Sequence, residues 1–75
     1  MTDGRWKYAK ELITGDKIVL SIHGLRTDLE VVSIEFKRRG ALEYYLLTGK
    51  RLNGEEMSTS CSKLEHIRLI RALRD

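Results

Sequence analysis

The segment Asp28–Arg38, with the sequence DLEVVSIEFKR, decides the fold class of this chain. It is rich in β-branched and aromatic residues, which pack well on the pleated surface of a sheet. In an extended strand, Val32, Ile34 and Phe36 share one face, and the residues between them share the other. Because the segment has no polar face at the helical period, we expect a strand and not an amphipathic helix.

Further segments of strand composition lie on both sides of this one, separated by turn signals such as Thr14-Gly15-Asp16 and Asn53-Gly54. The expected strands are Lys17–Ile22, Asp28–Arg38, Leu42–Thr48, Glu55–Cys61 and His66–Arg71. Short strands at such regular spacing are typical of a small sandwich or barrel. We therefore expect an all-β fold, a small five-stranded antiparallel barrel.

The two ends of the chain allow alternatives. Residues Ser62–Glu65 fit a capping box, and His66–Arg71 can be interpreted as a strand or as part of a C-terminal helix. We expect a short helical turn over Ser62–Glu65 and then a strand, because a barrel needs a closing strand. The segment Trp6–Leu12 is expected either to lie across one end of the barrel or to form a short helical turn.

The composition indicates one small domain, residues 1–75, with a modest positive charge. Hydrophobic residues make up 41% of the chain and charged residues 33%, so the chain is not a disordered polar tract. Fourteen Lys and Arg against eleven Asp and Glu give a net charge of +3. Neither a signal segment nor a membrane-spanning apolar run is visible, so we expect a cytoplasmic protein without membrane contact.

The segment Glu11–Ile18 (ELITGDKI) resembles the entry E-L-x-x-G-D-x-I/V of small SH3-like barrels of bacterial and phage type, in which a tight Gly-Asp turn leads into the first strand. The resemblance implies a five-stranded SH3-like barrel, and a fold of this kind does not imply an activity. The same segment is similar to the opening of Hint domains. Their autoprocessing needs a Cys or Ser at the splice junction and a C-terminal Asn, where this chain has Met1 and Asp75, so we expect no autoprocessing.

The chain offers few groups for catalysis or metal binding. Cys61 is the only thiol, and His23 and His66 are the only imidazoles. A lone Cys in a strand is usually a small buried hydrophobe, and these three residues lack the paired spacing of zinc ligands. The adjacent Glu55 and Glu56 point to opposite faces of a strand, so they cannot chelate one ion together. We expect no enzyme, metal, cofactor or small-molecule substrate.

The basic residues gather at the expected turns. In a meander, the loops His23–Thr27 and Gly49–Gly54 share one end of the barrel, and the Arg39-Gly40 turn lies at the other. The first end would carry His23, Arg26, Lys50 and Arg51, the second Lys37, Arg38, Arg39, Lys63 and in part Lys10 and Lys17, with Glu30, Glu35, Glu43 and Glu65 between them.

These clusters predict a nucleic-acid-binding module that contacts phosphates with Lys37, Arg38, Arg39, Lys50, Arg51 and Arg26. Trp6, Tyr44 and Tyr45 are the candidates for base stacking; adjacent residues point opposite ways, so one of the two tyrosines belongs to the core. The competing interpretation is that the charges only solvate hairpin tips.

A second hypothesis is a protein-interaction module, such as a phage- or plasmid-type accessory protein that docks on a host complex or self-associates. The second and third expected strands carry apolar residues on both faces, which is typical of a surface covered by a partner. The candidate contact residues are Val31, Tyr45 and Leu47.

Overall fold

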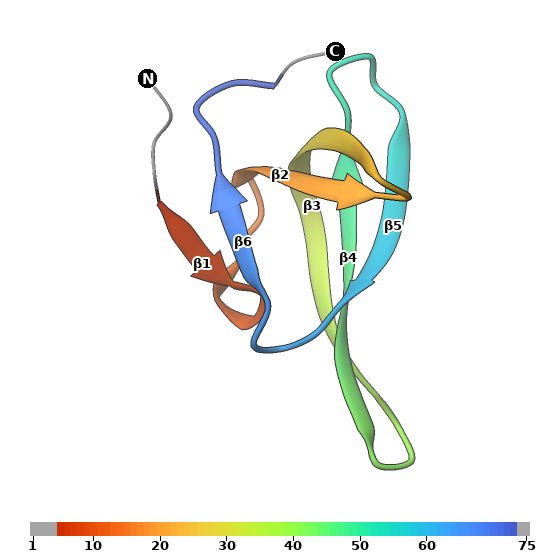
Figure 1. The fold of residues 1–75 in the computed structure, drawn as a ribbon. Helices are drawn as coiled ribbons and strands as arrows, with labels where there is room; N and C mark the ends of the chain where they lie inside the picture. Colours follow the sequence, from red (N-terminus) through yellow and green to blue (C-terminus); the bar gives the residue numbers. More distant parts are fainter. Residues whose placement is uncertain (1–4, 74–75) are drawn as a thin grey trace.

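The computed structural model describes residues 5–73, which form one antiparallel sheet of six strands with almost no helix (Figure 1). The elements are β1 (Trp6–Tyr8), the 3-10 turn η1 (Ala9–Glu11), β2 (Lys17–Ile22), β3 (Leu25–Arg39), β4 (Leu42–Lys50), β5 (Glu56–Cys61) and β6 (His66–Leu69). The strands neighbour one another in the order β1-β6-β2-β3-β4-β5. The all-β expectation is confirmed.

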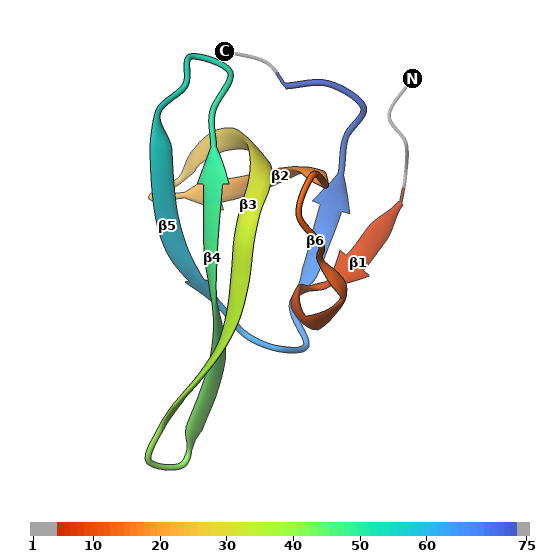
Figure 2. The same ribbon diagram turned by 180° about the vertical axis from the view of Figure 1, so that it is seen from behind.

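Strand β3 connects the two halves of the sheet. Its first half pairs with β2 and its second half with β4, and the register shifts between Val31 and Ser33, where Val32 is an extra residue. Such a bulge bends a strand and increases its twist. The bend lets β2 cross one face of β3, β4 and β5, as the opposite views in Figures 1 and 2 show.

The segment before β2 docks on this bulge. Val31 exchanges hydrogen bonds with the turn, donating to the carbonyl of Asp16 (2.8 Å) and accepting from the N–H of Gly15 (2.9 Å). The hydroxyl of Thr14 donates to the Val32 carbonyl (3.1 Å). These three bonds extend the β2–β3 pairing beyond Lys17 and hold the turn against the bulged residues.

The core lies between the crossed strands. Its largest fully buried side chains come from β2, β3, β4 and β6; they are Ile18, Leu29, Val31, Leu47 and Ile67. Ala9, Leu12 and Cys61 complete the cluster. The expectation that Cys61 is a small core residue is confirmed by its 3% exposure.

The expected five-stranded barrel is not confirmed, because the sheet has six strands and is not closed. Trp6–Tyr8 forms an additional strand, and within residues 5–73 the edge strands β1 and β5 do not pair with each other. The physical reason is that β1 pairs with β6 along the edge that closure would require for β5. The sheet is therefore open.

The C-terminal strand is confirmed and the alternative C-terminal helix is wrong. His66–Leu69 pairs with both β1 and β2. The preceding segment is a single turn, in which the N–H of Glu65 donates to the carbonyl of Ser62 (3.0 Å), and not the expected helical turn. Among the described residues, no helix has the length and apolar character needed to cross a membrane.

Candidate nucleic-acid interface

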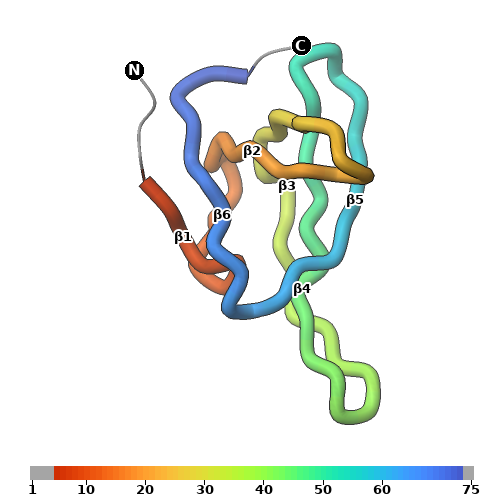
Figure 3. The backbone as a smooth tube through the Cα atoms, viewed as in Figure 1, coloured from red at the N-terminus to blue at the C-terminus, as the bar shows by residue number. Residues whose placement is uncertain are grey.

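The β3–β4 hairpin projects from the body of the protein (Figures 1 and 3). The two strands stay paired as far as Arg39 and Leu42, and Gly40 (φ +61°) makes the turn that links them. Only the inner end of the hairpin reaches the core. Side chains toward its tip are therefore exposed on both faces, and 51% of the Phe36 surface is accessible.

The two faces of the hairpin differ. We call the face that continues the core, with Ile34 and Leu47, the inner face, and the opposite one the outer face. On the inner face, the rings of Phe36 and Tyr45 meet edge to face, with centroids 5.5 Å apart and planes at 65°. Tyr45 also packs against the core, so it lies between the core and Phe36. Phe36 is thus an exposed aromatic ring in a supported position.

Two cations share one carboxylate beside these rings. Arg38 donates from Nη2 to Oε2 of Glu43 (2.9 Å), and Lys63 Nζ, from the β5–β6 connection, donates to Oε1 (3.1 Å). Lys63 and then Arg38 hold the pKa of Glu43 below its ordinary value. Two positive charges and one negative charge leave the group with a net charge of +1. We name Phe36, Tyr45, Arg38, Glu43 and Lys63 the hairpin patch.

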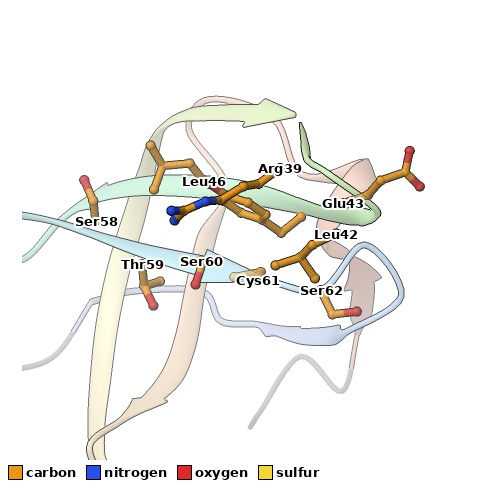
Figure 4. A pocket seen from close by; sticks show the side chains of 10 residues that line it. Arg39, Leu42, Glu43, Leu46, Ser58, Thr59, Ser60, Cys61 and Ser62 are labelled. Atoms are coloured by element: carbon orange, nitrogen blue, oxygen red, sulfur yellow. The ribbon is translucent and has the colours of Figure 1, made fainter. Parts of the chain in front are cut away.

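The outer face of the hairpin carries the other two cations of the predicted basic tip. Lys37 is paired with Glu35 (3.0 Å). Arg39 has no hydrogen bond or ion pair within residues 5–73. Its side chain borders an open groove of about 590 Å³ along β4 and β5, beside Leu46, as Figure 4 shows.

The predicted second basic end does not form. The β2–β3 turn lies beside β5, whereas the β4–β5 turn lies at the end of β4 and β5 that is farthest from the β3–β4 turn (Figure 1). The two turns are apart because the bend in β3 turns β2 across the sheet. Arg26 pairs with the buried Asp28 (2.9 Å), which raises the Arg26 pKa. Arg51 faces Glu55 at 3.9 Å, and Lys50 lies opposite Glu30 in the ladder.

Two further cations expected near the hairpin lie elsewhere. Lys10 in η1 lies over the ring of Tyr8, 5.8 Å from its centroid. Lys17 in β2 faces Glu30 at 3.8 Å. The structure therefore brings together Lys37, Arg38, Arg39 and Lys63 and separates them from the remaining predicted cations.

Val31 and Leu47 are wrong as surface contact residues, because both are completely buried. Strand β4 carries apolar residues on both faces, as expected. Tyr44 and Leu46 line the groove on its outer face, and Leu47 fills the core on its inner face. Tyr45 is half-buried against the core, so the core member of the tyrosine pair is Tyr45.

Phe36 was missed as a candidate site residue. The sequence alternation places Phe36 on the same face as Ile34, which packs against the core, and the structure confirms that the two side chains share this face. The exposure of Phe36 follows from the length of the hairpin, since the paired strands run past the core. The only signal in the sequence was that the strand candidate is longer than a small core needs.

The groups suited to catalysis do not converge. Burial, helped by the charge of Glu65, raises the pKa of the Cys61 thiol to about 11. The ring of His66 lies against Tyr8, with centroids 4.6 Å apart. In the described part of the chain, no group of three or more His, Cys, Asp or Glu could hold a metal ion. The hairpin patch can bind by stacking and charge, and it contains no activated nucleophile.

No family model matches this chain, and neither a curated protein nor a solved structure matches it at a significant level. The function must therefore be inferred from the geometry of the hairpin patch.

Proposed function

We propose that this protein is a non-enzymatic binding module that contacts single-stranded nucleic acid through the hairpin patch. One observation carries the proposal: an exposed aromatic ring, Phe36, is held by Tyr45 beside two cations. Single-strand binders combine these two elements, with bases stacked on aromatic rings and cations following the backbone.

The aromatic part supports binding of an unpaired base. The edge-to-face contact with Tyr45 uses one side of Phe36, and about half of the ring's residue surface is open to solvent. A ring that is already fixed loses little entropy when a base stacks on it. A base inside a duplex cannot present its face, so the proposal is limited to single strands.

The charged part supports contact with phosphate. Arg38 and Lys63 each use one bond on Glu43, which leaves further N–H donors on both side chains. Lys37 and Arg39 add positive potential from the outer face. If about three phosphates are neutralised, the logarithm of the affinity falls with the logarithm of salt with a slope of about −2.

The proposal includes the SH3-like fold family. Strands β2, β3, β4 and β5 form a meander, and β6 then pairs with β2. In an open sheet of this kind, the β3–β4 hairpin remains free to project and to present its inner face.

The test is a fluorescence-polarisation titration of a labelled single-stranded oligonucleotide at low salt. We expect Phe36→Leu to weaken binding about tenfold, because base stacking on an aromatic ring contributes roughly 1–3 kcal/mol. The matched control is Trp6→Leu, since Trp6 is also exposed (56%) but lies outside the hairpin patch. For charge, Lys63→Gln is compared with Lys10→Gln.

Either of two results would contradict the proposal. One is the absence of binding by the wild-type protein at low salt. The other is an equal loss of affinity in Phe36→Leu and Trp6→Leu, which would show that the contact is not made by the hairpin patch.

A further inference from the structure

The edge of β5 differs from the other edge of the sheet. Within residues 5–73, β5 (Glu56–Cys61) pairs only with β4, so one side of its backbone has no strand neighbour. Strand β1, at the opposite edge, has three residues, and a short edge strand offers little to a partner. Strand β5 has six residues, a continuous register and an uncharged centre, Met57–Ser60.

The direction in which the main-chain groups of β5 point follows from the hydrogen bonds at the β4–β5 turn. Arg51 donates its N–H to the carbonyl of Glu55 (2.8 Å) and accepts from the N–H of Gly54 (2.9 Å), so its main-chain groups point to the second strand of the β4–β5 hairpin, as in a hydrogen-bonded pair. Such pairs alternate along an antiparallel ladder. The main-chain N–H and C=O groups of Glu56, Ser58 and Ser60 therefore point away from β4, toward the free edge.

A side-chain contact agrees with this assignment. The hydroxyls of Thr48 and Ser58 lie 3.1 Å apart across β4 and β5. Side chains approach most closely in pairs that do not exchange main-chain hydrogen bonds. Ser58 is thus a residue whose main-chain groups remain available at the edge.

We infer that this edge pairs with β5 of a second copy of the chain, in antiparallel register about Ser58. This register places Ser58 opposite Ser58 of the partner and Glu56 opposite Ser60, so all three residues with outward groups are used. Each such pair exchanges two hydrogen bonds, which gives about six across the dyad. Shifting the partner by two residues leaves at least one outward residue without its counterpart.

Charge complementarity supports a second copy as the occupant. Glu56 and Ser60 have side chains on the outer face, by the same alternation that places Ser58 there. Ser60 lines the groove that Arg39 borders, and Figure 4 shows the Arg39 side chain lying along this groove. The register brings Glu56 of the second copy to this groove. Neither Arg39 nor Glu56 has an ion pair within residues 5–73, and the two-fold axis supplies one to each.

This inference does not depend on nucleic-acid binding, because the edges of β5 pair in the free protein. The test is the oligomeric state of the free protein, measured by light scattering over a concentration series. The wild type is expected to form a dimer. Glu56→Lys and Arg39→Glu are each expected to raise the dimer Kd about tenfold, because each change alters two ion pairs. The double variant Arg39→Glu/Glu56→Lys is expected to return the Kd to near the wild-type value.

A backbone variant tests the edge itself. Ser58→Pro removes an N–H that points away from β4, so the β4–β5 ladder is kept while the central pair across the dyad is lost. We expect this variant to keep the wild-type circular-dichroism spectrum and to remain monomeric. A strictly monomeric wild type, a Ser58→Pro variant that dimerises normally, or a double charge variant as weak as the single ones would each overturn the inference.

Discussion

Gly49 is the position where adding one methyl group tests the packing most directly. Gly49 is buried in β4 opposite Val31, next to the bulge. A Cβ atom at this position would lie 2.8 Å from Cβ of Leu29 and 3.0 Å from its Cδ1. Leu29 is itself completely buried in the core, so it has little room to move.

The free energy of unfolding of Gly49→Ala results from two opposing effects. Ala restricts the unfolded chain more than Gly does, which stabilises a protein by about 0.4–1 kcal/mol where the backbone allows it. Overpacking a core costs roughly 1–3 kcal/mol. We therefore expect a net loss of about 1–2 kcal/mol and, in a domain of this size, a Tm lower by about 5–15 °C.

The assay is thermal unfolding followed by circular dichroism, with denaturant unfolding as the second measurement. The double variant Leu29→Ala/Gly49→Ala serves as a control. Its Cβ at position 29 remains, so the closest contact persists and the double variant should not recover the stability lost by Gly49→Ala. A Tm of Gly49→Ala equal to or above that of the wild type would show that the Leu29 contact causes no overpacking, because the conformational effect alone would then account for the change.

The remaining predictions concern Cys61 and the buried residue Leu47. Because burial raises the pKa of the Cys61 thiol from 9.0 to about 11, its thiolate fraction at pH 8 is about a hundredfold lower than that of a free thiol, so native protein should react with iodoacetamide at least that much more slowly than unfolded protein. The same shift means that stability is lost as pH rises from about 9 to 11, since the unfolded thiol ionises first; a flat unfolding free energy across this window would contradict it. Leu47→Ala should cost about 2–5 kcal/mol, whereas Leu64→Ala, at a residue 62% exposed, should stay within about 0.5 kcal/mol; equal melting curves would exclude Leu47 from the core.

Much of the strand pattern could be predicted because turns are local. Gly15, Gly24, Gly40 and Gly54 all have positive φ, and each lies in a turn that the sequence marked. At Asn53-Gly54, the Asn53 side chain also accepts the N–H of Glu55 (2.9 Å), a local contact that Asn readily makes. Strand β1 was missed because three residues carry too little pattern to identify, and β6 provides its pairing.

The candidate site could be predicted only in part. Arg38 and the hairpin turn were correctly placed at one end, because residues near a turn remain together in any antiparallel hairpin. Lys63 was placed there too, and it reaches Glu43 because β5 ends beside β4. Arg26 does not lie beside Lys50 and Arg51, contrary to expectation. The expectation assumed that the β2–β3 and β4–β5 hairpins run parallel, whereas the bend in β3 turns the β2–β3 hairpin across the sheet.

Local sequence pattern was enough to predict that the chain forms strands, where these strands turn, and that Ile34 and Phe36 share a face. The pattern did not predict that Val31 shares that face and that Val32 leaves it. The extra residue between Val31 and Ser33 reverses the alternation, and it is held there by contacts with Thr14–Asp16, far away along the chain. How far the core extends along the hairpin depends on the packing of distant segments, because a residue is buried only where another strand crosses it. That limit leaves Phe36 exposed beside Arg38, although the same alternation buries Leu47.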